Sequence, residues 1–143
     1  YIKVEMYEGH VEACGIKSTT IRTVNNEVVI LPNSFIKQII NYSKDYYISF
    51  YEFNIGFEED ISQVERIVVE KFIPIVKSIE HVGEVEYKGI QKLGEHAITL
   101  RVQVNCNAEE RFQVRRNMNK ELLEVLRSEK IEIPYNQITV HTK

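Results

Sequence analysis

The stretch GHVEACGIKSTTIRTVNNEVVILPNSFIKQIINYS, residues 9–43, decides how the first third of this 143-residue chain folds. Two runs rich in β-branched residues, 16–24 and 27–31, are separated only by Asn25 and Asn26. Because Asn tolerates the positive φ angles of a two-residue hairpin turn, we expect the two runs to pair as strands.

The segment after this hairpin contains a turn signal. Pro32 has no backbone N–H to donate to a neighbouring strand, so strand pairing is expected to stop there. Asn33 can then cap a short turn at residues 34–38 with its side-chain oxygen. Residues 39–42 return to an extended, apolar pattern. Residues 1–45 are therefore predicted to form a small β domain.

A second domain is predicted from residue 46 onward. Residues 46–55 are dense in aromatic and β-branched residues, which favours a strand. Asp60 can cap the following helix, with Gln63 three positions later as a capping box prefers. That helix should kink or end near Pro74, because the ring collides with the carbonyl four residues back.

Two more strands, a long helix and a last strand are expected after Pro74. Residues 82–90 and 96–104 have strand patterns, residues 108–130 have a helical one, and residues 137–141 alternate apolar and polar side chains. The order strand-helix-strand-strand-helix-strand is that of a ferredoxin-like domain. The predicted fold class is β plus α+β, with a β domain at 1–45 and a ferredoxin-like domain at 46–143 that ends in a C-terminal strand.

Composition predicts a globular fold that does not itself cross a membrane. The chain is 43% apolar and 27% charged, which is ordinary for soluble domains. Charges interrupt every apolar run, so none reaches the roughly 18 consecutive apolar residues of a membrane-spanning helix. The chain starts at Tyr1, without an initiator Met or a signal-peptide pattern, which suggests a fragment. Any membrane part is expected to precede Tyr1.

Charge argues against a nucleic-acid partner. The net charge is −3; residues 1–45 hold 5 Lys/Arg against 5 Asp/Glu, which leaves 13 against 16 for residues 46–143. Neither part has the basic excess that drives phosphate binding. The basic residues between 111 and 127 are interleaved with Glu, which indicates an ordinary solvated face.

We expect no enzyme activity, no cofactor and no metal. The four histidines lack the spacing that would place two of them on one face as metal ligands. A phosphate loop needs Gly directly before Lys and a helix after it, whereas Lys17 follows Ile16 and precedes a strand. Cys14 and Cys106 lack Cys-x-x-Cys spacing, so they are interpreted as small buried hydrophobes in a reducing compartment.

The motifs in residues 9–43 resemble the β domain of the small-conductance mechanosensitive ion channel family. The likeness rests on a Gly-x-Val start, a Ser-Thr-Thr-x-Arg-Thr strand, an Ile-x-Pro-Asn turn and an Ile-x-Asn-x-Ser exit. It continues more loosely to the end of the chain, although Phe57 and Asn136 replace a Tyr and a Pro that are frequent in the family. The residues that match the motif are Gly9, Ser18, Thr19, Arg22, Thr23, Pro32, Asn33, Asn41, Ser43 and Pro134.

The resemblance implies an Sm-like β domain and a role for the motif residues in structure and assembly. It implies a heptamer that is anchored in the cell membrane by upstream helices absent from this chain. This part would lie on the cytoplasmic side as a vestibule that holds the subunits in register and filters solutes. Residues 137–141 would join a small parallel barrel.

Two other functions remain as alternatives. An Sm-like ring could bind RNA, although the balanced charge of residues 1–45 counts against it. A ferredoxin-like domain could instead sense a small molecule, a hypothesis that rests on fold analogy alone.

Overall fold

The computed structural model describes residues 1–43 and 45–134, and these form two compact units. Unit 1 contains Tyr1–Tyr47 together with Asn107–Glu110, and unit 2 contains Ile48–Cys106 and the chain from Arg111 onward. The predicted last strand, residues 137–141, lies outside the described residues. The assignment of domains at 1–45 and 46–143 stays a prediction.

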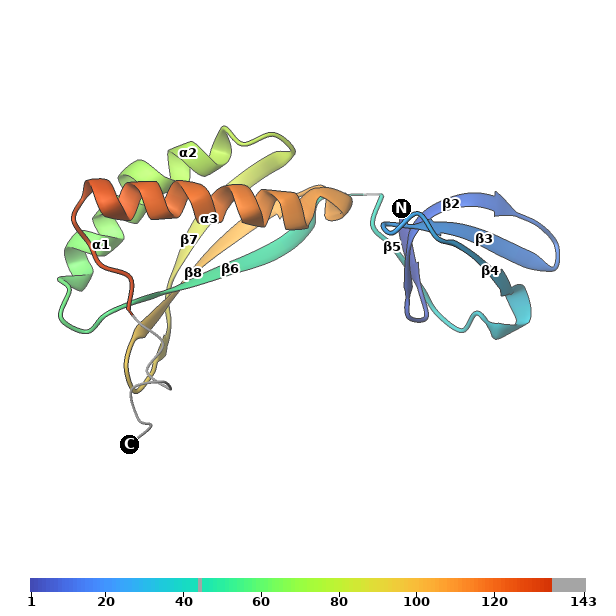
Figure 1. The fold of residues 1–143 in the computed structure, drawn as a ribbon, viewed down its shortest axis with the longest axis horizontal. Helices are drawn as coiled ribbons and strands as arrows, with labels where there is room; N and C mark the ends of the chain where they lie inside the picture. Colours follow the sequence, from blue (N-terminus) through green and yellow to red (C-terminus); the bar gives the residue numbers. More distant parts are fainter. Residues whose placement is uncertain (44, 135–143) are drawn as a thin grey trace. The chain divides into compact units, whose positions relative to one another are not determined.

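Unit 1 is built on one antiparallel sheet (Figure 1). The strands stand in the order β4-β3-β2-β1-β5, so β4 and β5 are its two edges. A short 3-10 helix connects β4 to β5. The elements are β1 (Ile2–Val4), β2 (Tyr7–Cys14), β3 (Ser18–Thr23), β4 (Val28–Pro32), η1 (Asn33–Phe35) and β5 (Ile39–Asn41).

The predicted hairpin is present, but its turn differs from the expected one. β3 and β4 pair as predicted. The Thr23 N–H donates to the Glu27 oxygen and the Asn26 N–H donates to the Thr23 oxygen, both at 2.9 Å. The prediction of a two-residue turn is therefore wrong: the loop has three residues. Of the two asparagines only Asn26 has a positive φ, 64°, which is typical of a type I turn closed by one left-handed residue.

Gly9 is required where β2 passes closest to β3. It lies opposite Thr23 in the sheet and also opposite Ile2 of β1. A Cβ atom at position 9 would stand 2.1 Å from the Arg22 carbonyl oxygen. No side chain fits at that distance, so the motif glycine sets the spacing of the central strands.

Unit 2 combines three strands with helices that lie along one side of them (Figure 1). The strand order is β6-β8-β7, which is the order of the first three strands in a ferredoxin-like sheet. With the β sheet of unit 1, this confirms the predicted class, β plus α+β. The elements are β6 (Tyr47–Ile55), α1 (Ile61–Ile67), η2 (Val68–Phe72), α2 (Ile73–Lys77), β7 (Val82–Leu93), β8 (Ile98–Cys106), η3 (Ala108–Glu110) and α3 (Arg111–Ser128).

The helix after β6 is capped by Asp60, as predicted, and its regular winding is interrupted shortly before Pro74. The Asp60 carboxylate accepts a hydrogen bond from the Ser62 N–H at 3.1 Å, one position before Gln63. Before Pro74 the helix widens into the π-helical turn η2, where the Ile73 N–H donates to the Val68 oxygen. The wider turn makes room for the proline ring, so α2 continues with Pro74 in its first turn.

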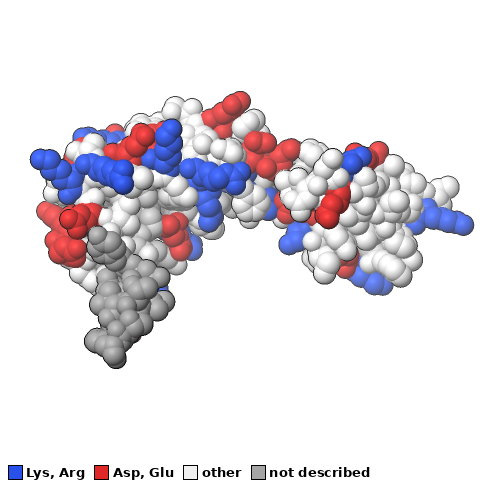
Figure 2. Space-filling view, in the orientation of Figure 1, with Lys and Arg blue, Asp and Glu red and all other residues white. Residues whose placement is uncertain are grey.

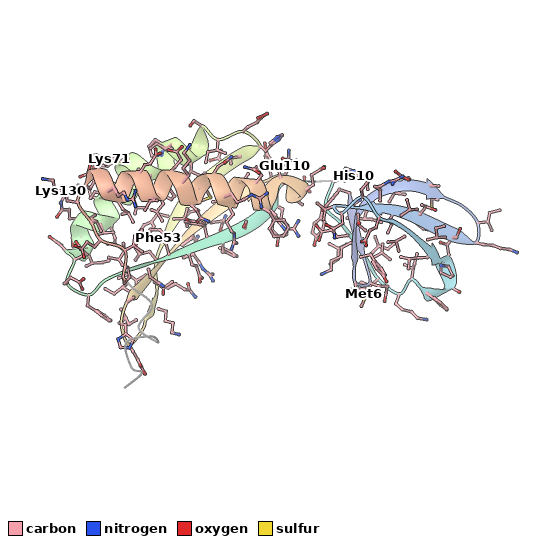
Figure 3. The ribbon with its side chains drawn as sticks, in the orientation of Figure 1. Met6, His10, Phe53, Lys71, Glu110 and Lys130 are labelled. Atoms are coloured by element: carbon pink, nitrogen blue, oxygen red, sulfur yellow. The ribbon has the colours of Figure 1, made fainter. Side chains whose placement is uncertain are left out.

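The core of unit 2 lies between the sheet and the helices. Every second residue of β8 is buried, from Ile98 to Cys106, and α3 buries one stripe that includes Met118 and Leu126. Phe53, labelled in Figure 3, lies on the buried face of β6, 6.2 Å from the Phe72 ring. The buried residues of the strands thus pack against the buried stripe of the helices and form one apolar layer.

The Tyr51 side chain is the polar member of this core. Its hydroxyl donates to the Asn119 Oδ1 at 2.5 Å, and the ring lies 6.1 Å from the Phe72 ring. Burial raises the pKa of Tyr51 to about 12, although the nearby Arg115 acts in the opposite direction. Burial, followed by the hydrogen bond to Glu65, also raises the pKa of Tyr87.

We expect Gly9→Ala to destabilise unit 1 strongly, because the new methyl group would collide with the Arg22 carbonyl oxygen. Overpacking of this kind costs about 1–3 kcal/mol or more of the free energy of unfolding. Urea denaturation followed by circular dichroism measures the change. Gly15→Ala is the matched control, because the nearest atom to its new Cβ is 3.5 Å away. Equal stability of the two variants would contradict the close approach.

We also expect the stability of unit 2 to fall at alkaline pH. The pKa of Tyr51 is raised in the folded state, so its contribution is fully present below about pH 10 and is lost as the pH rises toward 12. Urea denaturation at several values between pH 9 and pH 12 should show a shallower decline for Tyr51→Phe than for the unchanged chain. Parallel curves for the two proteins would show that Tyr51 does not contribute.

Candidate functional site

The motif residue Asn33 makes hydrogen bonds through its side-chain amide and through its backbone N–H. Its Nδ2 donates to the carbonyl oxygens of Gly15 and Ile16, both at 3.0 Å, and its Oδ1 accepts from the Thr19 hydroxyl at 2.7 Å. The Asn33 N–H donates to the Lys17 oxygen at 2.8 Å. We call this set of four contacts the Asn33 clasp. It ties the end of β4 to the loop between β2 and β3.

The prediction that Asn33 caps the following turn is wrong. No side chain makes a capping hydrogen bond to η1, and Pro32 occupies the residue before it. The Asn33 oxygen is used instead by Thr19, which is 7% exposed. A partner in a neighbouring strand therefore replaces the local cap.

Pro32 ends the pairing of β4, as the sequence predicts. It lies opposite Ser18, the first residue of β3. Beyond this pair the chain leaves the sheet through η1, because a proline has no N–H to continue the ladder. Ser18 and Pro32 thus mark the corner that the Asn33 clasp holds.

Arg22 and Thr23 support the other end of the hairpin. The Arg22 Nε donates to the Glu12 carboxylate at 2.8 Å, and its Nη1 lies 3.3 Å from the Asn26 Oδ1. The hydrogen bond from Arg22 holds the pKa of Glu12 below its usual value. The Thr23 hydroxyl accepts from the Glu27 N–H at 3.2 Å.

Asn41 and Ser43 close the exit from unit 1. The Asn41 Oδ1 accepts from the Ser43 N–H at 2.9 Å, and the Tyr42 N–H donates to the Tyr1 oxygen at 3.0 Å. Nine of the ten predicted motif residues therefore lie in unit 1. Pro134 belongs to unit 2 and is not brought into this network.

Sequence reasoning missed several partners of these residues. Gly15 and Ile16 contribute only backbone oxygens to the clasp, so their side chains give no signal for it. Outside the motif, the His10 Nε2 lies 2.7 Å from the Glu109 Oε2 within unit 1, although 99 positions separate the two residues. Pairs of this kind become visible only when the chain is folded.

The usual metal-ligating side chains do not form a cluster in the described residues. Among residues 1–43 and 45–134, no group of three or more His, Cys, Asp or Glu side chains could hold a metal ion. Cys14 is exposed, so its interpretation as a buried hydrophobe is wrong; it is the last residue of β2, and every residue of this strand from His10 onward is exposed. Cys106 is buried as expected, and burial raises the pKa of its thiol.

The face seen in Figure 2 has mixed charge, and the described helices do not match a membrane span. Figure 2 shows acidic and basic side chains side by side over the visible face. Within the described ranges, no helix has both the length and the apolar character needed to cross a bilayer.

Comparisons with known proteins agree with this geometry. A family model described as "Mechanosensitive ion channel, beta-domain" matches residues 1–44. The chain is 23% identical over 141 residues to the small-conductance mechanosensitive channel of Caldanaerobacter subterraneus subsp. tengcongensis, with 98% of this chain and 50% of that protein covered. It is 28% identical over 146 residues to an uncharacterized MscS family protein of Synechocystis, with 98% and 48% covered.

The fold has a counterpart among solved structures. The crystal structure of Helicobacter pylori MscS in its closed state matches with a TM-score of 0.78 and 23% identity, over 99% of this chain and 57% of that one. Residues 1–44 are thus a β domain of the mechanosensitive-channel class. The chain as a whole is similar to MscS-type proteins, as the motifs predicted, and it spans about half the length of the curated relatives that it matches.

We expect Asn33→Ala to lower the free energy of unfolding of unit 1 by about 1–3 kcal/mol, because three side-chain hydrogen bonds are lost and Thr19 loses its acceptor. Asn33→Asp should be at least as destabilising, because a carboxylate would face two carbonyl oxygens. Thermal and urea denaturation measure both changes.

Asn25→Ala is the control for these variants, because Asn25 is exposed in the hairpin loop and its side chain is outside the clasp. Its substitution should leave stability within about 0.5 kcal/mol of the unchanged chain. An Asn33→Ala protein as stable as this control would show that the clasp is dispensable.

Proposed function

We propose that this chain is the vestibule of a small-conductance mechanosensitive channel, on the cytoplasmic side of the cell membrane. The observation that carries the proposal is the match of residues 1–44 to the channel β domain, together with relatives that align along nearly the whole chain. In this role the chain holds subunits in register and filters solutes during tension-gated ion efflux. It performs no reaction.

The edges of the unit 1 sheet support a role in assembly. Both edge strands carry exposed apolar side chains: Ile30 on β4 is 65% exposed, and Ile39 on β5 is 55% exposed. Unpaired edges with apolar residues favour contact with another chain. We propose that copies of this chain supply that contact in a homo-oligomer, a heptamer by family resemblance.

The motif residues have structural roles in this proposal. The Asn33 clasp fixes the corner after β4, and Gly9 sets the spacing of the central strands. Upstream helices anchor the assembly in the membrane and sense tension. The chain then receives their movement at Tyr1, whose carbonyl oxygen accepts hydrogen bonds from the Tyr42 N–H and the Ser43 hydroxyl at the exit from unit 1.

The test uses the full-length protein that contains this chain. In membrane patches under suction it should conduct ions above a threshold tension, and native mass spectrometry should show seven subunits. Ile30→Lys should lower the fraction of intact oligomer, because a charge on β4 opposes contact at that edge.

Val24→Lys is the matched control, since Val24 is 89% exposed but lies in the hairpin loop rather than on an edge strand. A full-length protein that has no apolar helices upstream of Tyr1, or that conducts no ions under tension, would contradict the channel proposal. If the protein forms a stable oligomer that Ile30→Lys does not affect, the result would contradict only the assignment of the β4 edge to the subunit contact.

A further inference from the structure

The face of the unit 2 sheet that points away from the core contains a hollow of about 640 Å³. Side chains from all three strands line it, and they are the residues that alternate with the buried ones along β6 and β8. The lining residues are Glu52 and Asn54 of β6, Gln91 and Lys92 of β7, and Thr99 and Arg101 of β8.

Part of this lining is already paired internally. The Arg101 guanidinium donates to the Glu52 Oε2 through its Nε at 2.8 Å, and its Nη2 lies 2.6 Å from the same oxygen. The Arg101 guanidinium also lies over the Phe50 ring, 4.4 Å from its centre. The ion pair of Arg101 and Glu52 forms one end of the hollow, and its two charges nearly cancel.

The other end is rich in hydrogen-bond donors. Lys92 lies opposite Thr99 in the sheet, and the Thr99 hydroxyl donates to the Asn54 Oδ1 at 2.7 Å. This hydrogen bond uses the oxygen of the Asn54 amide, so the two N–H donors of that amide remain available to a ligand. The Gln91 amide and the Lys92 ammonium add further donors, and in the described part of the chain neither is engaged in a hydrogen bond or ion pair.

Gly89 leaves β7 without a side chain opposite Arg101. It has a φ of 114°, which favours glycine. An added Cβ atom there would meet no other atom within 4 Å. The space beside this position is therefore open.

We propose that this hollow binds the oxyanion of a small solute, a carboxylate or a phosphate, at the end formed by Lys92, Asn54 and Gln91. One carboxylate and two cations give the lining a net charge of +1. The second oxygen of Glu52 disfavours an anion at the far end, so the ligand lies next to Lys92. The inference goes beyond the channel role and does not depend on it.

The test is a titration of the 143-residue chain by NMR, at constant ionic strength, with succinate, inorganic phosphate and neutral succinamide. Succinate or phosphate should shift the amide signals of Lys92 and Thr99, and succinamide should not. Lys92→Gln should weaken binding about tenfold, because it removes a charge-assisted hydrogen bond. Asn54→Asp should abolish binding, because it places a carboxylate beside the oxyanion.

Lys88→Gln is the matched control on the same strand, because Lys88 lies 3.5 Å from Glu86 and does not line the hollow. It should bind as tightly as the unchanged chain. A response to succinate alone assigns a carboxylate, and a response to phosphate alone assigns a phosphate. Equal weakening by Lys88→Gln, equal binding of succinamide, or no shift at millimolar concentrations would overturn the proposal.

Discussion

The arrangement of unit 1 depends on the side-chain amide of Asn33. An amide offers two N–H donors and one strong acceptor, and here both kinds are used: the donors meet the Gly15 and Ile16 oxygens, and the acceptor meets the Thr19 hydroxyl. No other side chain of this size can do both. With the corner fixed, η1 leads the chain to β5, whose Ile40 lies opposite Lys3 of β1. The first and last strands of the sheet are thereby joined.

Much of the fold follows from local rules, and the errors arise where the surrounding sheet decides the outcome. The paired strands β3 and β4, the irregular helix before Pro74 and the long helix were predicted because alternation, helical spacing and a missing N–H act within a few residues. The turn after Thr23 was wrong by one residue, since the choice between two-residue and three-residue loops depends on strand twist as well as on Asn tolerance. The role of Asn33 was also wrong, because its partners lie 14 to 18 positions away. A local cap is the default only when no neighbouring strand competes for the oxygen.

The same alternation that builds the core of unit 2 also builds its open face. Along β8 the residues from Ile98 to Cys106 are buried at every second position, and those between them are half-buried. The sequence therefore predicted a strand with one wet face. It could not predict the hollow there, because the consecutive residues Gln91 and Lys92 both line it beside a register shift in β7. Bulges of this kind redirect side chains and carry no simple sequence signature.

The small core of unit 1 links its folding to contacts beyond its own sheet. Among the described residues, its buried apolar side chains are only Val4, Ile21 and Ala108, whereas unit 2 buries a continuous layer from three strands and its helices. A domain of about 50 residues buries a low fraction of its surface and is marginally stable alone. Hydrogen bonds such as the Asn33 clasp position the strands, but each adds only about 1 kcal/mol. Burial of exposed Ile30 and Ile39 against other chains would add the apolar contact that unit 1 lacks. Assembly and folding of this unit would then be one equilibrium rather than two successive steps.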